Sequence, residues 1–361
     1  MTERQQSKKR DHEFLATKWE KAYMAVATFE AIVVGGIAIT GFTLVQIHIT
    51  NPNTTTRTVP VYLANFLFAQ LFSLVYVFDA LRQRNVIQLA LHLFFNVCIW
   101  VYSILQIPQT ENALSHARPG GCGSMPCVGP NSLYNLLEKV YIVTPIVLGL
   151  CTIIFCLLVR KLYIEFGWAV FHLVHASPEM KRMHREYETL LSLLKLIFFF
   201  GTAFCLAYLI LLTHIKRDVG DFVISILALV LTPITIVATG WAARRENKPV
   251  MATCIFLMVA GLVYFIYRLA SLFLPKNREL YNNTRITMAI FSVFAILSLM
   301  MTFGYGCLCM SNFGKGLLEA HQNPHKRSGL WALSSNPKPP EKIRADFEAE
   351  QPHAGDRLVI D

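Results

Sequence analysis

Residues 286–310 read ITMAIFSVFAILSLMMTFGYGCLCM, a stretch that contains no Asp, Glu, Lys or Arg. A helix needs about 20 apolar residues to cross a hydrocarbon core that is roughly 30 Å thick. This stretch is long enough and apolar enough to meet that requirement. It therefore predicts a transmembrane helix at the carboxyl end of an apolar region.

Similar apolar stretches, separated by charged residues, occur throughout the preceding part of the chain. A first stretch of this length, without a small-residue cleavage site, is typical of a signal anchor rather than of a removable signal peptide. The chain is therefore predicted to be all-α, a polytopic integral membrane protein with about eight transmembrane helices. The expected spans cover residues 23–48, 61–81, 86–107, 140–159, 189–213, 222–243, 250–274 and 286–310.

Composition supports a membrane location. Hydrophobic residues make up 54% of the 361 residues and charged residues only 16%, whereas soluble domains carry roughly 25% charged residues. A soluble protein of this composition would expose large apolar patches, so the lipid bilayer is the expected partner. The net charge of +10 is attributed to the loops rather than to nucleic-acid binding, and no nucleic-acid partner is expected.

The distribution of positive charge predicts the orientation. If the amino terminus is cytosolic, the inner segments carry 23 of the 33 Lys and Arg residues, and the outer segments carry nine, with Arg268 near the outer end of its span included. Lys195 lies within a span. Cytosolic loops are enriched in these residues, so both termini are expected in the cytosol. The candidate N-glycosylation sites at Asn53 and Asn282 then fall in outer loops.

Three segments outside the spans are expected to face the cytosol. They are an amino-terminal tail over residues 1–22, a loop over 160–188 and a largely disordered carboxyl-terminal tail over 311–361. The loop predicts an interfacial helix with Trp168 at the level of the headgroups. A second helix is expected to begin near Pro178, a residue type favoured at the first helical position.

The nine cysteines do not predict a disulfide framework or a zinc site. Cys122 and Cys127, in the expected outer loop, form either a small disulfide or two free thiols. Cys307 and Cys309, at the cytosolic end of the last span, are candidate palmitoylation sites.

Ionisable and amide side chains inside the spans form the main candidate site. Gln88, His92 and Asn96 recur every four residues and so share one helical face. Counted at 1.5 Å per residue from the cytosolic helix starts, Glu30 and Lys195 lie about 9 to 10 Å deep, level with His92. We expect a polar layer that serves as a binding pocket or a proton relay. The candidate layer comprises Glu30, Asp79, Gln88, His92, Asn96 and Lys195.

A purely structural interpretation explains the same residues. Glu30 and Lys195 would form an ion pair that holds two helices in register, and Asp79 would pair with Arg82 at a helix end. The amides and the histidine would make ordinary interhelical hydrogen bonds. Arg268, close to the outer end of its span, is expected to extend toward the headgroups.

Two prolines lie within the expected spans. Pro145 and Pro233 are predicted to kink their helices, because proline removes one backbone hydrogen bond in a helix interior. The structural role of a kink is favoured over a gating role.

Short motifs in a fixed order resemble a known family. They are Phe166-Gly167-Trp168, Ala176-Ser177-Pro178, Leu193-Leu194-Lys195, Arg244-Arg245-Glu246-Asn247-Lys248 and Asn312-Phe313-Gly314-Lys315-Gly316-Leu317. In order and spacing they resemble an uncharacterised fungal family of multi-pass Golgi-apparatus membrane proteins. The resemblance covers most of the membrane region but not the tails. It implies a Golgi or related endomembrane location and a fungal source, and it implies no molecular activity.

Three functions are compatible with the sequence. The first is a non-enzymatic Golgi protein in trafficking or membrane organisation, which uses its cytosolic segments to contact other proteins or anionic lipid headgroups. The alternative is a small-solute or lipid transporter that uses the polar layer. The third, a lipid enzyme with His92 as base, lacks an accompanying nucleophile or metal set. No cofactor and no metal are expected.

Overall fold

A computed structural model gives the fold. It describes residues 15, 17–49, 56, 58–117, 122–123, 125–171, 178–212, 219–274 and 285–314. Within these ranges the secondary structure is helical, without a β-strand. The helices are α2 (Lys18–His48), α3 (Thr58–Gln83), α4 (Val86–Ser115), α5 (Leu133–Tyr141), α6 (Val143–Phe171), α7 (Pro178–Leu212), α8 (Val219–Arg245), α9 (Lys248–Phe273) and α10 (Arg285–Ser311).

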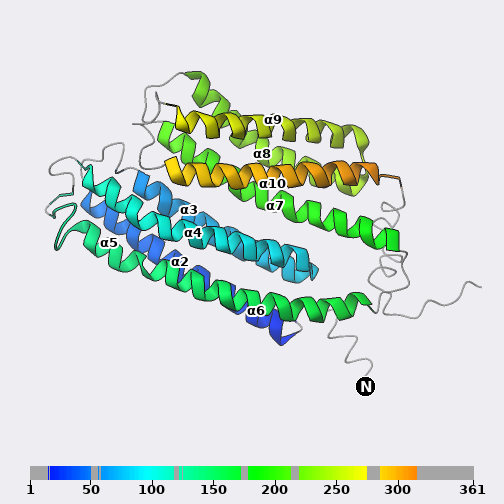
Figure 1. Ribbon diagram of the computed structural model, residues 1–361, viewed down its shortest axis with the longest axis horizontal. Helices are drawn as coiled ribbons and strands as arrows, with labels where there is room; N and C mark the ends of the chain where they lie inside the picture. Colours follow the sequence, from blue (N-terminus) through cyan, green and yellow to red (C-terminus); the bar gives the residue numbers. More distant parts are fainter. Residues whose placement is uncertain are drawn as a thin grey trace, which may run out of the picture.

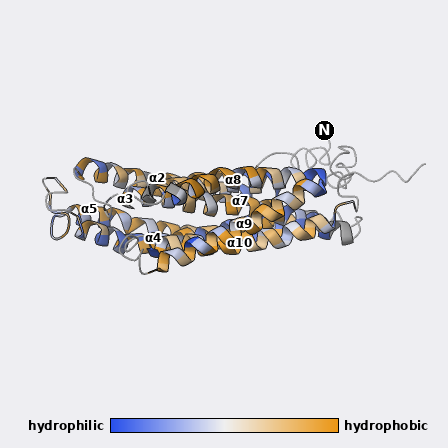
Figure 2. Ribbon diagram, turned by 90° about the horizontal axis from the view of Figure 1, so that it is seen from above, coloured by the Kyte–Doolittle hydropathy of each residue, from blue (hydrophilic) through white to orange (hydrophobic). Residues whose placement is uncertain are grey.

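The described part of the chain contains eight helical segments that could cross a membrane. Each is long and apolar enough to span a bilayer, and α5 with α6 forms a single crossing. Hydrophobic residues run along the lengths of the helices (Figure 2). The expected all-α fold with eight transmembrane helices is thus confirmed.

The helices form two four-helix bundles (Figure 1). The first bundle consists of α2, α3, α4 and α6, and the second of α7, α8, α9 and α10. In each bundle consecutive helices pack on one another, and the last helix packs on the first to close the ring. The two halves of the chain therefore share one order of neighbours, although no repeat is visible in the sequence.

The turns between the second and third helix of each bundle are also alike. Arg84 and Glu246 both have a φ of 50°, and the next residue, Asn85 or Asn247, caps the following helix. The backbone N–H of each asparagine bonds to a carbonyl five residues earlier, on Ala80 or on Ala242. This is the Schellman arrangement that ends helices with a left-handed residue.

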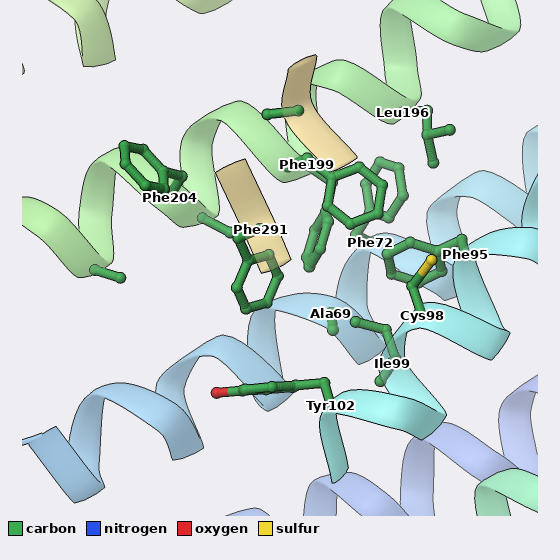
Figure 3. Close-up of a cluster of buried hydrophobic side chains, with 14 of the residues drawn as sticks. Ala69, Phe72, Phe95, Cys98, Ile99, Tyr102, Leu196, Phe199, Phe204 and Phe291 are labelled. Carbon is green, nitrogen blue, oxygen red and sulfur yellow. The ribbon is translucent and has the colours of Figure 1, made fainter. Parts of the chain in front are cut away.

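The bundles meet along α7, which packs on α3 and α4 and is the most buried of the eight spans. Aromatic rings from both bundles fill this interface (Figure 3). The Phe72 and Phe95 rings of the first bundle lie 5.1 and 4.8 Å from that of Phe199. Tyr102 meets Phe291 of α10 at 5.2 Å. The interface between the two bundles is therefore an apolar seam.

Contacts between helix ends show which ends lie together. Arg84, in the turn after α3, pairs with Glu20 at the start of α2. Asn312, just after α10, donates to Glu186 near the start of α7. These ends form what we call the inner end of the molecule, and the opposite end is the outer end. The start of α2 and the end of α10 thus lie at the same end of their bundles.

In two connections the helix of the preceding span continues farther than expected, whereas α7 begins at Pro178 as predicted. An interfacial helix was predicted within residues 160–188. Up to Phe171 this segment belongs to α6, which continues to that residue without a break. No Pro or Gly interrupts residues 160–166 to end it. In the expected outer loop, α4 continues through Pro108 to Ser115, where buried Ala113 and Leu114 belong to the core.

The proline predictions fare differently. Pro233 lies inside α8, as expected. Pro145 lies in the first turn of α6, three residues after Ile142, where the helix is interrupted between α5 and α6 within one crossing. A kink at this position stays a prediction. The Pro145 carbonyl accepts a hydrogen bond from the indole of Trp100, at 2.9 Å.

Candidate functional site: the polar core of the first bundle

The polar face of α4 points into the first bundle. Gln88, His92 and Asn96 are each 1% exposed or less. Their four-residue spacing places them on one face, as the sequence predicted. Each side chain meets a different partner, so the face forms three successive stations along α4.

The innermost station joins the two bundles. The Lys195 ammonium of α7 donates to the Asp79 carboxylate of α3 and, at 3.2 Å, to the Gln88 amide oxygen. The Gln88 amide nitrogen returns a hydrogen bond to Asp79 at 3.0 Å. Gln83 donates to the other oxygen of that carboxylate at 2.7 Å. Asp79 is thus held by one cation and two amides.

The second station is His92. The Tyr23 hydroxyl lies 2.8 Å from its Nδ1 and the Ser73 hydroxyl 2.8 Å from its Nε2. The ring also packs against the ring of Phe155, at 5.0 Å. Because both ring nitrogens are engaged and the side chain is completely buried, His92 is a fixed member of a hydrogen-bond chain.

The third station is Glu30, which is 1% exposed. Asn96 donates to its carboxylate at 3.2 Å and to the Thr152 hydroxyl at 3.1 Å. The Gln70 amide and the Cys151 thiol also lie against the carboxylate. All these neighbours are uncharged, and Glu30 makes no salt bridge with any other described residue.

The structure corrects two predicted pairings. Lys195 pairs with Asp79 and not with Glu30, because it lies level with Gln88, whereas Glu30 lies level with Asn96. The eight residues from Gln88 to Asn96 correspond to about 12 Å along a helix, so the expected single layer is a column. Asp79 is held across the bundle interface rather than by Arg82.

The second bundle contains a buried cation that the sequence analysis misplaced. Arg268 was expected to extend to the headgroups, but it is 1% exposed. Its guanidinium donates to the Tyr208 hydroxyl at 2.8 Å, and to the Asp221 carboxylate and the Ser225 hydroxyl at 3.2 Å. The guanidinium also lies over the rings of Tyr208 and Tyr264, at 4.5 and 5.3 Å. The clustering of Tyr264, Tyr267 and Arg268 in the sequence was the available signal.

The remaining candidate residues lie at the ends of the helices. Cys122 and Cys127 form a disulfide. Cys309 is a buried free thiol and Cys307 is partly exposed, and their palmitoylation stays a prediction. Asn53, Asn282 and the carboxyl-terminal tail from residue 315 lie outside the described residues. Among the described side chains, no group of three His, Cys, Asp or Glu is placed to hold a metal ion.

Comparison with known proteins supports the resemblance. The chain is 26% identical over 275 residues to a UPF0658 Golgi apparatus membrane protein of the fission yeast Schizosaccharomyces pombe, an alignment that covers 72% of this chain and 77% of the relative. No family model matches the chain, and no solved structure matches it. The relative confirms the predicted similarity to uncharacterised fungal Golgi membrane proteins and the predicted placement in the Golgi membrane.

Proposed function

We propose that this protein is a small-solute transporter of the Golgi membrane in which Glu30 binds and releases a cation, in the simplest case a proton. The observation that carries the proposal is the environment of Glu30, a buried carboxylate surrounded by uncharged partners. An ionised group without a counter-charge is expensive inside a membrane, and such acids commonly mark ion or proton pathways. Because Glu30 makes no salt bridge with another described residue, a change of its charge breaks no ion pair.

The arrangement of the bundles supports transport. Many carriers work by rocking one helical bundle against another. Here the Asp79–Lys195 ion pair connects the bundles near the inner end, while aromatic rings connect them farther along α7. If the ion pair breaks while the aromatic rings stay packed, the two bundles can separate at the inner end. The Asp79–Lys195 ion pair then holds the inner ends of the two bundles together.

The test is proton flux into proteoliposomes that contain the purified full chain and a pH-sensitive dye, driven by a potassium diffusion potential. The wild type should acidify the lumen faster than liposomes without protein. Glu30→Gln should reduce the rate to that of empty liposomes, because the amide cannot take up a proton. Glu111→Gln, at an exposed position near the end of α4, serves as the matched control and should keep the wild-type rate.

Either of two results would contradict the proposal. One is a Glu30→Gln protein that is folded, by its elution as a single species in detergent, and that keeps the wild-type flux. The other is a wild-type protein with no flux above empty liposomes under any imposed gradient.

A role in trafficking or membrane organisation is the second candidate. One observation favours it: the start of the carboxyl-terminal tail is fixed to the second bundle, through Asn312 on Glu186 and the Gly314 N–H on Glu246, both at 2.7 Å. A tail that leaves from a fixed point suits the recruitment of cytosolic proteins or of anionic headgroups. Truncation after Leu317 should then change Golgi localisation or the set of copurifying proteins, and an unchanged outcome for both would dismiss this role.

A further inference from the structure

Every helix of the first bundle brings a polar side chain to the place where Glu30 lies. Glu30 itself comes from α2, and its neighbours are Gln70 from α3, Asn96 from α4 and Cys151 from α6. Each of these four side chains is 5% exposed or less. Because the carboxylate is enclosed by the four helices, a change of its charge has to be accommodated by one of these neighbours.

The three neighbours are arranged for an ionised carboxylate. The Asn96 amide donates to it at 3.2 Å, and the Gln70 amide and the Cys151 thiol donate to it as well. A protonated Glu30 carries a hydroxyl that has to donate, and a buried donor without an acceptor is unfavourable. Proton uptake therefore requires one neighbour to change from a donor into an acceptor.

Asn96 and Cys151 are poorly suited to that change. The Asn96 amide nitrogen also donates to the Thr152 hydroxyl, at 3.1 Å, so a turn of this amide would break two hydrogen bonds. The Thr152 hydroxyl in turn donates to the Leu148 carbonyl, at 2.7 Å. The sulfur of Cys151 is only a weak acceptor. Gln70 is the neighbour that remains.

Gln70 carries an acceptor that the ionised state of Glu30 does not use. Its amide oxygen is buried without a hydrogen-bond partner among the described residues, while its amide group donates to Glu30. The amide is planar and carries an acceptor on one side and a donor on the other, so a half-turn about the Cγ–Cδ bond exchanges the two. Such a turn presents the oxygen to a protonated Glu30 without the movement of a helix.

We infer that Gln70 is a positioning residue for the proton on Glu30, and that its amide makes a half-turn each time Glu30 gains or loses that proton. On uptake, an O–H bond forms at one carboxylate oxygen, the negative charge is lost, and the new hydroxyl donates to the Gln70 oxygen. On release, the proton leaves and the Gln70 nitrogen donates to the carboxylate again. The inference rests on the proposed exchange of a proton at Glu30.

The other groups around Glu30 leave this role to Gln70. The titratable groups that face the carboxylate are the Cys151 thiol of α6 and, from α2 itself, the Tyr23 hydroxyl. Helices α3 and α4 face it with the amides of Gln70 and Asn96. Both titratable groups are neutral when protonated, so neither supplies a charge that could replace the proton.

The test is infrared difference spectroscopy of the purified full chain in lipid, recorded while the pH of the buffer is changed. The band of a protonated carboxyl that is lost in Glu30→Gln belongs to Glu30. In the wild type this band should appear together with a shift of a glutamine amide band. In Gln70→Leu the amide shift should be absent, and the Glu30 band should move to higher wavenumber because the hydroxyl has lost its acceptor.

Gln106→Leu is the matched control. Gln106 is 3% exposed and also has one amide atom without a partner among the described residues, but it lies about 15 Å farther along α4 than Asn96. This variant should keep both wild-type signals. A folded Gln70→Leu protein with the wild-type Glu30 band would overturn the inference. A wild type without a Glu30 band at any pH at which it stays folded would overturn it as well.

Proton flux separates this inference from the transport proposal. The predicted infrared changes in a protein without flux into proteoliposomes would keep the role of Gln70 and reject transport. Flux that depends on Glu30, with an unchanged Glu30 band in Gln70→Leu, would reject the role of Gln70 and keep transport.

Discussion

Ionisable side chains that lie between the helices of this protein differ in how their charge is compensated. Arg268 has a carboxylate, two hydroxyls and aromatic faces around it. Asp79 has one cation and two amides. Glu30 has uncharged neighbours. A fully compensated charge serves to hold helices together, whereas an uncompensated one is suited to a change of charge, and so Glu30 is the residue on which function depends in our proposal.

The Asp79–Lys195 ion pair should behave as a coupled unit. Asp79→Asn and Lys195→Met each leave the other charge without its partner between the bundles, so each should lower the thermal stability of the protein in detergent. The double variant removes both charges and should lose less than the sum of the two single losses. Because each side chain is 32% exposed, we expect a coupling energy of about 1 kcal/mol, within the range of contacting pairs.

The measurement is a double-mutant cycle, read from melting curves by fluorescence-detected size-exclusion chromatography. Lys161→Met, at an exposed position of α6, controls for the loss of a positive charge. Strictly additive single effects would show that the two residues do not stabilise the protein as a pair.

Arg268 should be a structural residue that lysine cannot replace. Arg268→Met leaves the Asp221 carboxylate without its buried cation and should destabilise the protein by about 3 to 5 kcal/mol, as when one partner of a buried ion pair is removed. Arg268→Lys should recover little of this, because a single ammonium cannot reach the same set of acceptors as a planar guanidinium. The same melting curves measure both variants, and wild-type stability for Arg268→Lys would contradict the described geometry.

The sequence predicted most of the residues of the polar core but not their pairing. The periodicity of Gln88, His92 and Asn96 was sufficient to place them on one face. The partner of Lys195 was not predictable, because the depth of a residue in the membrane does not tell which helices are neighbours. Arg268 was misplaced for the same reason: its partners, Tyr208 and Asp221, come from two other helices, α7 and α8.

At the scale of helices, close contact is concentrated where glycine permits it. Gly41 of α2 lies against Tyr141, whereas Gly36 of the same helix has no atom within 4 Å of the place where a Cβ would stand. In α2, packing therefore requires a glycine at position 41 but not at position 36.

Substitution of these two glycines should give opposite results. Gly41→Ala forces Tyr141 to move and should destabilise the protein by about 1 to 3 kcal/mol, the usual cost of overpacking. Gly36→Ala meets open space and should be neutral or slightly stabilising, because alanine favours helix. Melting curves in detergent compare the two variants directly, and equal effects would contradict the described packing of α2 on α5.

The extent of the helices was predicted less well than their number. The lengths of the apolar stretches predicted every span, because the thickness of a bilayer sets the length of a transmembrane helix. The continuation of α4 through Pro108 was missed because burial of Ala113 and Leu114 outweighs the hydrogen bond that proline removes. The shared turns at Arg84 and Glu246 carry a signal in the sequence, an asparagine directly after a charged residue, that is too short to be recognised alone.

At the scale of the whole molecule, the chain folds as two successive four-helix rings with one order of neighbours. Because each ring begins and ends at the inner end, the two halves have the same orientation rather than opposite orientations. The sequence predicted eight spans but could not predict this grouping, since the choice of neighbours depends on side chains from distant segments. Rocking of the first bundle against the second is the motion that the grouping allows.

The most direct test of this arrangement is the position of both termini across the membrane. A fluorescent protein is fused to the amino or the carboxyl end, the fusions are expressed in fungal cells, and intact Golgi vesicles are treated with protease. We predict that both tags are digested without detergent, which fits eight spans with both ends in the cytosol and places Asp79, Lys195 and Glu30 in the inner half of the membrane. A tag that is protected at only one end would mean an odd number of crossings, and would contradict both the two-bundle arrangement and the transport route built on it.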